Sequence, residues 1–382
     1  MEATRTSGVR FYRPELDVIR FIAFLLVFLH HVLPIGGDIH IDHLLGSLAP
    51  VFYAFINACG YGLSLFFTLS AFLICELLLR ERESAGKIGI KQFYIRRILR
   101  IWPLYYFALA LGVIVALLPS GNHADLTRIG WFAIFMGAWL SAIHGWTSNP
   151  VNPLWSISVE EQFYLLAPGT VKYFSRKALY GFCAAVILIA NGWLYFLGSV
   201  QATGMRVWAD SFVQFECFAA GILLCLALRG RAIRISLLTR IIIIIACSFC
   251  WMTASYGLHA CFVQASANPG SWPLIGGYSL ASLGCVLMLI AFLGVDSKLL
   301  PGWAIYLGRI SYGLYVYHQF AIYMTTHLLT SFLISNHCPK SLIILGLTIL
   351  MAALSYRFIE TPFLKMKKRH AVIESQPIAG VV

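Results

Sequence analysis

Long apolar segments alternate with short polar stretches along the whole chain. Eleven segments approach the ~20 residues that a helix needs to cross the hydrocarbon core of a bilayer. They are 18–37, 59–79, 98–118, 127–144, 153–172, 177–198, 210–228, 237–257, 273–295, 302–326 and 341–363. No polar stretch between them is long enough to form a separate soluble domain. The pattern predicts an all-α polytopic membrane protein, with a transmembrane domain over 1–364 and a short basic tail over 365–382.

Composition supports this prediction. Of the 382 residues, 59% are hydrophobic and 12% are charged, and the mean hydropathy is +0.79. Soluble domains carry about a quarter charged residues. The net charge of +12 could indicate nucleic-acid binding, but the basic residues gather at the ends of apolar segments, where they set topology, so we expect no nucleic-acid partner. Cys247 and Cys250 form a CxxC pair inside an apolar run, and we predict no metal site.

The basic stretches also predict the orientation of the chain. Lysine and arginine cluster around 5–13, 80–100, 229–240 and 365–369, and such clusters face the cytoplasm. Eleven crossings would place the two basic termini on opposite sides. We therefore predict about ten transmembrane helices, both termini in the cytoplasm, and one re-entrant or partly inserted segment, either 127–144 or 153–172. Backbone that does not span is tolerated only against protein or water, so that segment is expected to line a cavity.

The first apolar segment carries two ionisable side chains on one face. Arg20 and His31 are eleven residues apart, which on a helix places them on nearly the same stripe, roughly 16 Å apart along the axis. Ionisable groups inside a membrane span are costly and mark candidate functional sites. His31 could make a structural hydrogen bond, or it could take a proton from a hydroxyl. Its neighbour His30 points about 100° away.

Three arginines enter the third apolar segment. Arg96 and Arg100 are four residues apart, and Arg97 and Arg100 are three apart, so each pair shares a helix face. The arginines could serve only as cytoplasmic topology anchors. They could also form a guanidinium cradle for a phosphorylated cytoplasmic ligand, because arginine pairs well with phosphate.

Carboxylates and a second histidine complete the candidate groups. Adjacent Glu160 and Glu161 stand at the edge of an apolar run, where Ser158 and Glu161 fit a helix-capping box. The same carboxylates could orient a histidine, pair with arginine or act as acid and base. His318 lies in an aromatic-rich segment, and Glu360 ends the last span beside the basic tail, with which it could pair.

These blocks together resemble the acyltransferase 3 family of membrane proteins. The matching stretches occur in the family's order from residue 13 to about 363. They are RPELDVIRFIAFLLVFLHH, GLSLFFTLSAFLI, FYIRRILRIWPLYY, LWSISVEEQFYLLAP, LGRISYGLYVYH and FIETP. Arg97 and Arg100 fall on the family's RxxR element, and Arg20 and His31 fit the spacing of its first span. Ser64 stands where an acidic residue is common, which puts an acidic role there in doubt.

The resemblance implies a membrane O-acyltransferase, most simply an O-acetyltransferase of the stand-alone form. Such an enzyme moves an acyl group from cytoplasmic acyl-CoA to a hydroxyl of a cell-surface or lipid-linked glycan, with acyl-CoA as donor substrate and no bound cofactor. The expected location is the bacterial inner membrane. Expected partners are acyl-CoA, the glycan acceptor, membrane lipids and proteins of polysaccharide biosynthesis or export.

The resemblance also suggests roles for the candidate residues. The CoA phosphates would bind Arg96, Arg97 and Arg100, helped by Arg13 or Arg20. His31 would act as general base or carry the acyl group as nucleophile. Glu160 or Glu161 would orient the imidazole.

Ser64, His318 and Glu360 remain further candidates. The alternative is a transporter or flippase of a sugar or glycan that uses the buried charges as a proton relay. A third possibility is a non-catalytic scaffold in polysaccharide export.

Overall fold

The computed structural model describes residues 11–119, 121–202, 204–231, 233–261, 269–328, 337–368 and 370, and every regular element among them is helical. The α-helices are α1 (Pro14–Val32), α2 (Ile39–Leu45), α3 (Ala49–Cys59), α4 (Gly62–Ala85), α5 (Ile90–Leu117), α6 (Asp125–Ala133), α7 (Gly137–His144), α8 (Trp155–Tyr173), α9 (Arg176–Ser199), α10 (Met205–Trp208), α11 (Ser211–Leu228), α12 (Leu237–Met252), α13 (Ser271–Phe292), α14 (Gly302–Arg309), α15 (Ser311–Leu328), α16 (His337–Ser355) and α17 (Thr361–Lys368). Short 3-10 or π turns are η1 (Gly46–Leu48), η2 (Asn152–Leu154), η3 (Thr253–Gly257), η5 (Ser297–Leu299) and η6 (Tyr356–Glu360).

Seven stretches of the described chain are long and apolar enough to cross a membrane. They are Ile39–Ala85, Ile90–Leu117, Arg176–Ser199, Ser211–Leu228, Leu237–Gly257, Ser271–Phe292 and Lys340–Lys367. Helices α1, α8 and α15 have 18 or 19 residues each, or about 27–28 Å at 1.5 Å per residue. They are more polar because they carry candidate site residues. Counting them gives the expected ten helices, and the span count stays a prediction.

The segment 127–144 is broken in the middle. It forms α6 and α7, of nine and eight residues, and Phe135 between them has a φ of 58°. Each piece rises only about 12–14 Å, less than half of the ~30 Å hydrocarbon core. The other candidate for the non-spanning segment, 153–172, lies almost entirely in the continuous helix α8. Neither α6 nor α7 alone is long enough to cross, and the identity of the segment that does not span stays a prediction.

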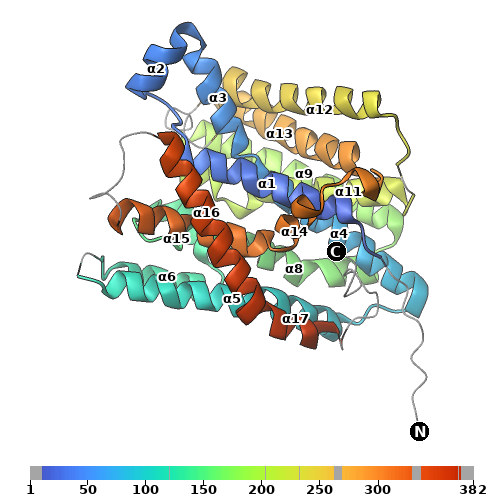
Figure 1. Ribbon diagram of the computed structural model, residues 1–382. Coiled ribbons are helices and arrows are strands. Elements are labelled where there is room, and N and C mark those ends of the chain that lie inside the picture. Colours follow the sequence, from blue (N-terminus) through green and yellow to red (C-terminus); the bar gives the residue numbers. More distant parts are fainter. Residues whose placement is uncertain are drawn as a thin grey trace.

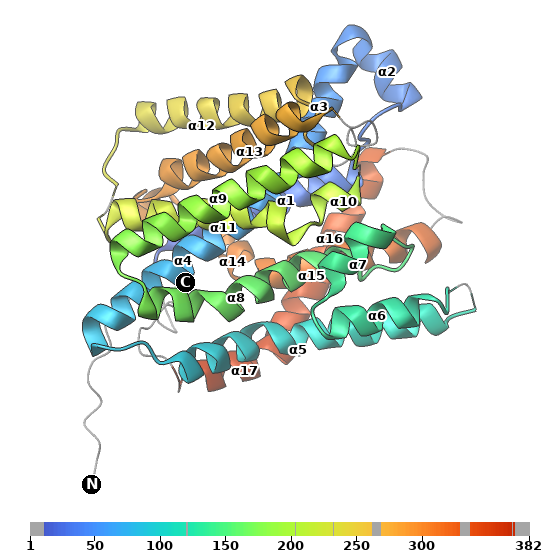
Figure 2. The ribbon, with the colours of Figure 1, turned by 180° about the vertical axis from the view of Figure 1, so that it is seen from behind.

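The long helices lie roughly side by side in one bundle. Figures 1 and 2 show α12 and α13 on one side of the bundle and α5 with α17 on the opposite side. Helix α4 lies between them and packs against α1, α8, α11 and α13. Helix α17 packs on α5 and continues past residue 364 to Lys368. The predicted domain boundary therefore falls inside a helix, and most of the predicted tail lies outside the described residues.

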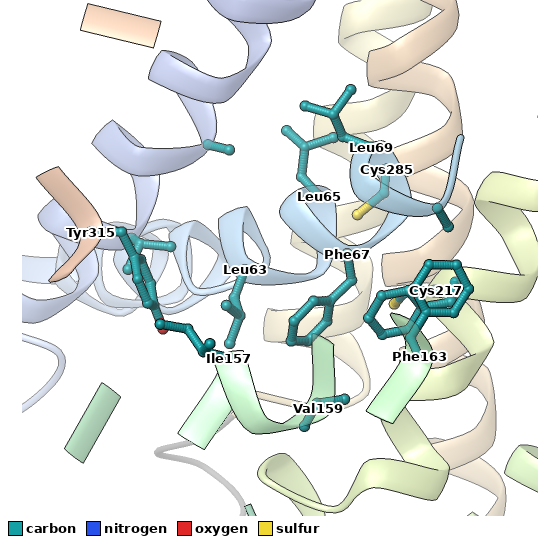
Figure 3. Close-up of a cluster of buried hydrophobic side chains, with 14 of the residues drawn as sticks. Leu63, Leu65, Phe67, Leu69, Ile157, Val159, Phe163, Cys217, Cys285 and Tyr315 are labelled. Carbon is teal, nitrogen blue, oxygen red and sulfur yellow. The ribbon is translucent and has the colours of Figure 1, made fainter. Parts of the chain in front are cut away.

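Aromatic and aliphatic side chains join α4, α8 and α11 at the centre. The Phe218 ring stacks on Phe67 and on Phe163, with ring centroids 4.9 and 4.4 Å apart. Figure 3 shows Phe67 of α4 beside Val159 and Phe163 of α8. This rigid apolar packing fixes α8 against α4, and both helices contribute to the cavity described next.

Candidate active site

A cavity of about 180 Å³ opens among α1, α4, α5, α8, α15 and α17. Part of its wall is apolar: Figure 3 shows Leu63, Ile157 and Tyr315, from three different helices, converging there. The rest is strongly charged. Six cations and three carboxylates line it, and they are Arg13, Arg20, Arg96, Arg97, Arg100, Lys367, Asp17, Glu81 and Glu160. The excess positive charge suits a polyanionic ligand.

All five arginines proposed from the sequence line this one cavity. Arg96, Arg97 and Arg100 come from α5. Arg100 is four residues from Arg96 and three from Arg97, so it shares a helix face with each of them. Arg13 precedes α1 directly, and Arg20 lies two turns further along α1. The structure brings these five arginines together at one cavity, and their role in binding a ligand there stays a prediction.

Three of the arginines are held by carboxylates. Arg20 donates to Asp17 at 2.6 Å, and Asp17 also accepts from the Tyr12 hydroxyl at 3.0 Å. Burial, and then the charge of Asp17, raises the pKa of the Tyr12 phenol, which keeps it protonated as a donor. Arg13 lies 3.9 Å from Glu15.

Arg96 makes two bonds that tie distant parts of the chain together. Its Nη2 donates to Glu81 at 2.8 Å, and its Nη1 donates to the His370 carbonyl at 2.9 Å. The other carboxylate oxygen of Glu81 accepts from the Gly89 amide at 2.9 Å. This network joins α4, the start of α5 and the segment after α17.

Arg97 and Arg100 differ from the other three. The Arg97 guanidinium lies 5.4 Å from the ring centroids of Phe93 and of Tyr164, and its Nε has no hydrogen-bond partner. Within the described chain, neither Arg97 nor Arg100 forms an ion pair with a carboxylate. These two guanidinium groups are therefore free to bind a ligand in the cavity.

The adjacent Glu160 and Glu161 have different surroundings. Glu160 lines the cavity, whereas Glu161 is not among its lining residues and keeps one buried oxygen without a hydrogen-bond partner. The capping-box interpretation of Ser158 and Glu161 is wrong. Helix α8 begins at Trp155, so Ser158 lies inside its first turns, and the residue at the N-cap is Leu154.

His31 lies among aromatic rings. Its ring centroid is 5.1 Å from that of His318, and it stacks on Trp146 at 5.7 Å with an interplanar angle of 5°. Its Nδ1 bonds the Val27 carbonyl at 2.8 Å. Neither Glu160 nor Glu161 is among these contacts, so their suggested role of orienting His31 has no support in the described geometry.

His31 and His318 each make a hydrogen bond to a backbone carbonyl through the same ring nitrogen, Nδ1. His318 bonds the Tyr315 carbonyl through Nδ1 at 2.5 Å, as His31 bonds Val27. A carbonyl only accepts hydrogen bonds, so Nδ1 carries the proton in each neutral ring and Nε2 keeps a lone pair. The buried Nε2 of His318 has no partner. His30 also bonds a carbonyl through Nδ1, but that carbonyl belongs to Ile56 of α3, 3.1 Å away, rather than to its own helix.

Ser156 and Tyr315 connect the cavity with the histidines. Both line the cavity, and their hydroxyl oxygens are 2.6 Å apart. The Tyr315 ring centroid lies 5.5 Å from that of His318. A continuous set of contacts thus leads from the arginine-lined cavity through Tyr315 to His318 and His31.

The remaining candidates lie elsewhere in the bundle. Ser64 is buried on α4, and its carbonyl accepts from Thr68. Glu360 is buried with one oxygen that has no hydrogen-bond partner, and none of the ion pairs in the described chain includes it. The suggested pairing of Glu360 with the basic tail is therefore not seen there.

Two residues of the site were not singled out from the sequence. Lys367 lines the cavity although it belongs to a basic stretch that the sequence presents as a topology signal. Trp146 stacks on His31 from the loop between α7 and α8. A clustered lysine and a loop tryptophan carry no spacing signal, so only the tertiary contacts reveal them. Across the described residues, no group of three or more His, Cys, Asp or Glu side chains could hold a metal ion.

Comparison with known proteins identifies relatives of the whole span. A Staphylococcus aureus protein (strain MSSA476) provisionally named as an O-acetyltransferase is 26% identical over 376 residues, covering 93% of this chain and 58% of the relative. The O-acetyltransferase OatA of Staphylococcus aureus (strain NCTC 8325 / PS 47) is 24% identical, covering 93% of this chain and 57% of its own length. The chain thus spans somewhat more than half the length of these curated relatives. No solved structure matches significantly.

The sequence profile of the acyltransferase domain matches residues 13–359. This stretch contains the six motif blocks on which the resemblance was based, apart from the last residues of FIETP. The resemblance is confirmed over most of the chain, and the protein belongs to the acyltransferase 3 family.

Proposed function

We propose that this protein is a membrane O-acyltransferase, in the simplest case an O-acetyltransferase, that uses cytoplasmic acyl-CoA as donor and acylates a hydroxyl of a cell-surface or lipid-linked glycan. The observation that carries the proposal is the continuous path from a cavity lined by unpaired guanidinium groups, through Tyr315, to the His318–His31 pair. Family membership and relatives named as O-acetyltransferases support the same reaction class.

In this proposal, Arg97 and Arg100 bind the phosphates of CoA. Charge-assisted hydrogen bonds from guanidinium to phosphate are strong, and the fork geometry of arginine matches phosphate oxygens. Arg13, Arg20 and Arg96 shape the positive field around them, while their carboxylate partners hold them in place. The thioester end would extend along the apolar wall past Leu63 and Ile157.

His31 acts as the general base. Its Nε2 lone pair takes the proton of the acceptor hydroxyl, and the hydroxyl oxygen attacks the thioester carbonyl. The new C–O bond forms as the C–S bond breaks, and the leaving CoA thiolate takes the proton back from the His31 imidazolium, which restores the base. A variant of the route has Nε2 of His31 attack first, giving an acyl-imidazole that the acceptor then cleaves. The two routes differ in whether label remains on the protein without an acceptor.

The direct test uses the purified full chain in nanodiscs with radiolabelled acetyl-CoA and a surface-glycan fraction from a strain that lacks the gene. We expect label to move to the glycan, and mass spectrometry and NMR to show matching acetyl groups in the parent strain and none in the deletion strain. Transport of glycan without transfer of label would instead establish the transporter alternative. Unchanged glycan acylation in the deletion strain would overturn the proposal.

We further propose an inner-membrane location with both termini in the cytoplasm, since the basic stretches and the cavity arginines lie on the donor side of such an arrangement. Helices α6 and α7 form the non-spanning segment in this topology. The loop that follows α7 brings Trp146 against His31, which is where an acceptor from the outer side would approach.

A further inference from the structure

Lys367 is an unusual cation because it is buried among other cations. Its side chain is 7% exposed, and it lines the same cavity as the five arginines. The charges of Arg100, Arg97, Arg20 and Arg96 all act on its ammonium group. Like charges at close range repel strongly where water is scarce, so this placement is unfavourable for the protein without a ligand.

No carboxylate in the described chain compensates this lysine. The four ion pairs found there involve Arg13, Arg20, Arg80 and Arg96. Of the three cavity carboxylates, Asp17 and Glu81 are already bonded to Arg20 and Arg96. The third, Glu160, acts electrostatically on Arg97 and forms no ion pair with Lys367 in the described chain. The remaining unpaired cations of the cavity are Arg97, Arg100 and Lys367, and a bound polyanion would neutralise all three together.

Contacts from α5 also hold Lys367 in place from outside its own helix. Helix α17 packs along α5, and Arg96 of α5 donates to the carbonyl of His370, three residues beyond Lys367. Because Arg96 donates from one terminal nitrogen to Glu81 and from the other to His370, it acts as a clamp for the C-terminal segment, and its charge is already paired with Glu81.

We infer that Lys367 of the C-terminal helix is a donor-binding residue that contacts a phosphate of acyl-CoA together with Arg97 and Arg100, and that Arg96 is the positioning residue that seats it. This inference rests on the proposed function. The phosphate site then consists of residues from two segments that are far apart in the sequence, α5 and α17, rather than from α5 alone.

The test compares Lys367→Met with Lys365→Met in the full chain. Lys365 is on the same helix and exposed, so it controls for the loss of one positive charge. The protein is placed in nanodiscs of zwitterionic phosphatidylcholine, which keeps anionic lipid headgroups out of the cavity. Coenzyme A binding is then measured by calorimetry, and thermal stability is measured without ligand.

We expect Lys367→Met to weaken coenzyme A binding by about ten-fold or more, as loss of a charge-assisted contact does. Lys367→Arg should retain most of the affinity, and Lys365→Met should retain all of it. The ligand-free Lys367→Met protein should melt at the same or a higher temperature than the parent, because a repulsive charge is removed. A purely structural lysine would show the opposite shift, a lower melting temperature.

The outcomes separate this inference from the proposed function. Unchanged coenzyme A affinity in Lys367→Met, alongside a large loss in Arg100→Met, would overturn the role of Lys367 and leave the proposed function standing. A fall in the melting temperature of ligand-free Lys367→Met would also overturn it. Absence of coenzyme A binding to the parent protein would overturn the proposed function itself. In a last outcome, phosphatidylglycerol added to the nanodiscs binds to the parent protein but not to Lys367→Met, and coenzyme A binds to neither protein. The cavity would then be a lipid headgroup site.

Discussion

Each of the two histidines of the proposed reaction centre makes a hydrogen bond to the backbone of its own helix, and this bond suits the ring to accept a proton. His31 bonds the carbonyl of Val27, four residues earlier, and His318 bonds that of Tyr315, three residues earlier. Each bond fixes a tautomer that leaves Nε2 free to accept. Among the residues that the structure describes, no carboxylate contributes to these bonds, and the ring orientation comes from the backbone and, for His31, from stacking on Trp146.

Replacement of His31 by alanine should remove the general base. We expect acyl transfer to fall by about 100-fold or more, the contribution typical of general base catalysis, while coenzyme A binding is retained because His31 is not among the residues that line the cavity. Transfer is measured with radiolabelled acetyl-CoA and binding by calorimetry.

The matched control is His327→Ala. His327 makes the same kind of bond to the carbonyl four residues earlier, but it is exposed on α15. Its replacement should leave transfer unchanged. Full activity of His31→Ala at a normal protein level would remove His31 from the mechanism.

At the scale of helices, close approach between α1 and α14 supports the arginine side of the cavity. A Cβ added at Gly308 would lie 1.9 Å from the carbonyl oxygen of Asp17, far inside van der Waals contact. Asp17 in turn holds Arg20 at 2.6 Å. A glycine is required at position 308 because the backbones of the two helices touch there.

Gly308→Ala should therefore push α14 away from α1. We expect a loss of about 1–3 kcal/mol in the free energy of unfolding, the range typical of overpacking, seen as a lower melting temperature in detergent. Gly302→Ala on the same helix is the control, since nothing lies within 4 Å of its added Cβ. Equal melting temperatures for the two variants would show that α1 and α14 do not pack as described.

Local patterns predicted some elements well and misjudged others. The face shared by Arg97 and Arg100 follows from helix geometry alone and was predicted. The capping box at Ser158 was a wrong interpretation, because the helix already starts at Trp155 behind a 3-10 turn. A four-residue motif indicates which capping hydrogen bonds could form, but it does not indicate at which residue the helix begins.

At the scale of the whole molecule, the two ends of α5 should face opposite sides of the membrane. Ser84 is exposed just before α5 begins. Ser148 is exposed in the loop after α7, and its neighbour Asn149 donates to the carbonyl of Gly112 near the other end of α5. The distance between these ends along α5 is about 33 Å.

We expect a membrane-impermeant maleimide to label Ser148→Cys in intact spheroplasts and Ser84→Cys only after lysis. The nine cysteines among the described residues are buried, and the parent protein measures any background. Labelling of both positions from the same side would contradict the proposed topology and the placement of the arginines on the donor side.

The amino-acid sequence alone determined the helical membrane architecture, the family and the groups of ionisable residues. These properties depend on segment length, hydrophobicity and spacing within one helix, which are local. The partners of the charged groups were decided by folding. Arg96 bonds the carbonyl of a residue 274 positions away, and Ser156 meets Tyr315 across 159 positions. Such contacts depend on how helices pack, so the sequence could group Arg96 with Arg97 and Arg100 but could not show that Lys367 joins the cavity or that His31 meets His318 rather than a glutamate.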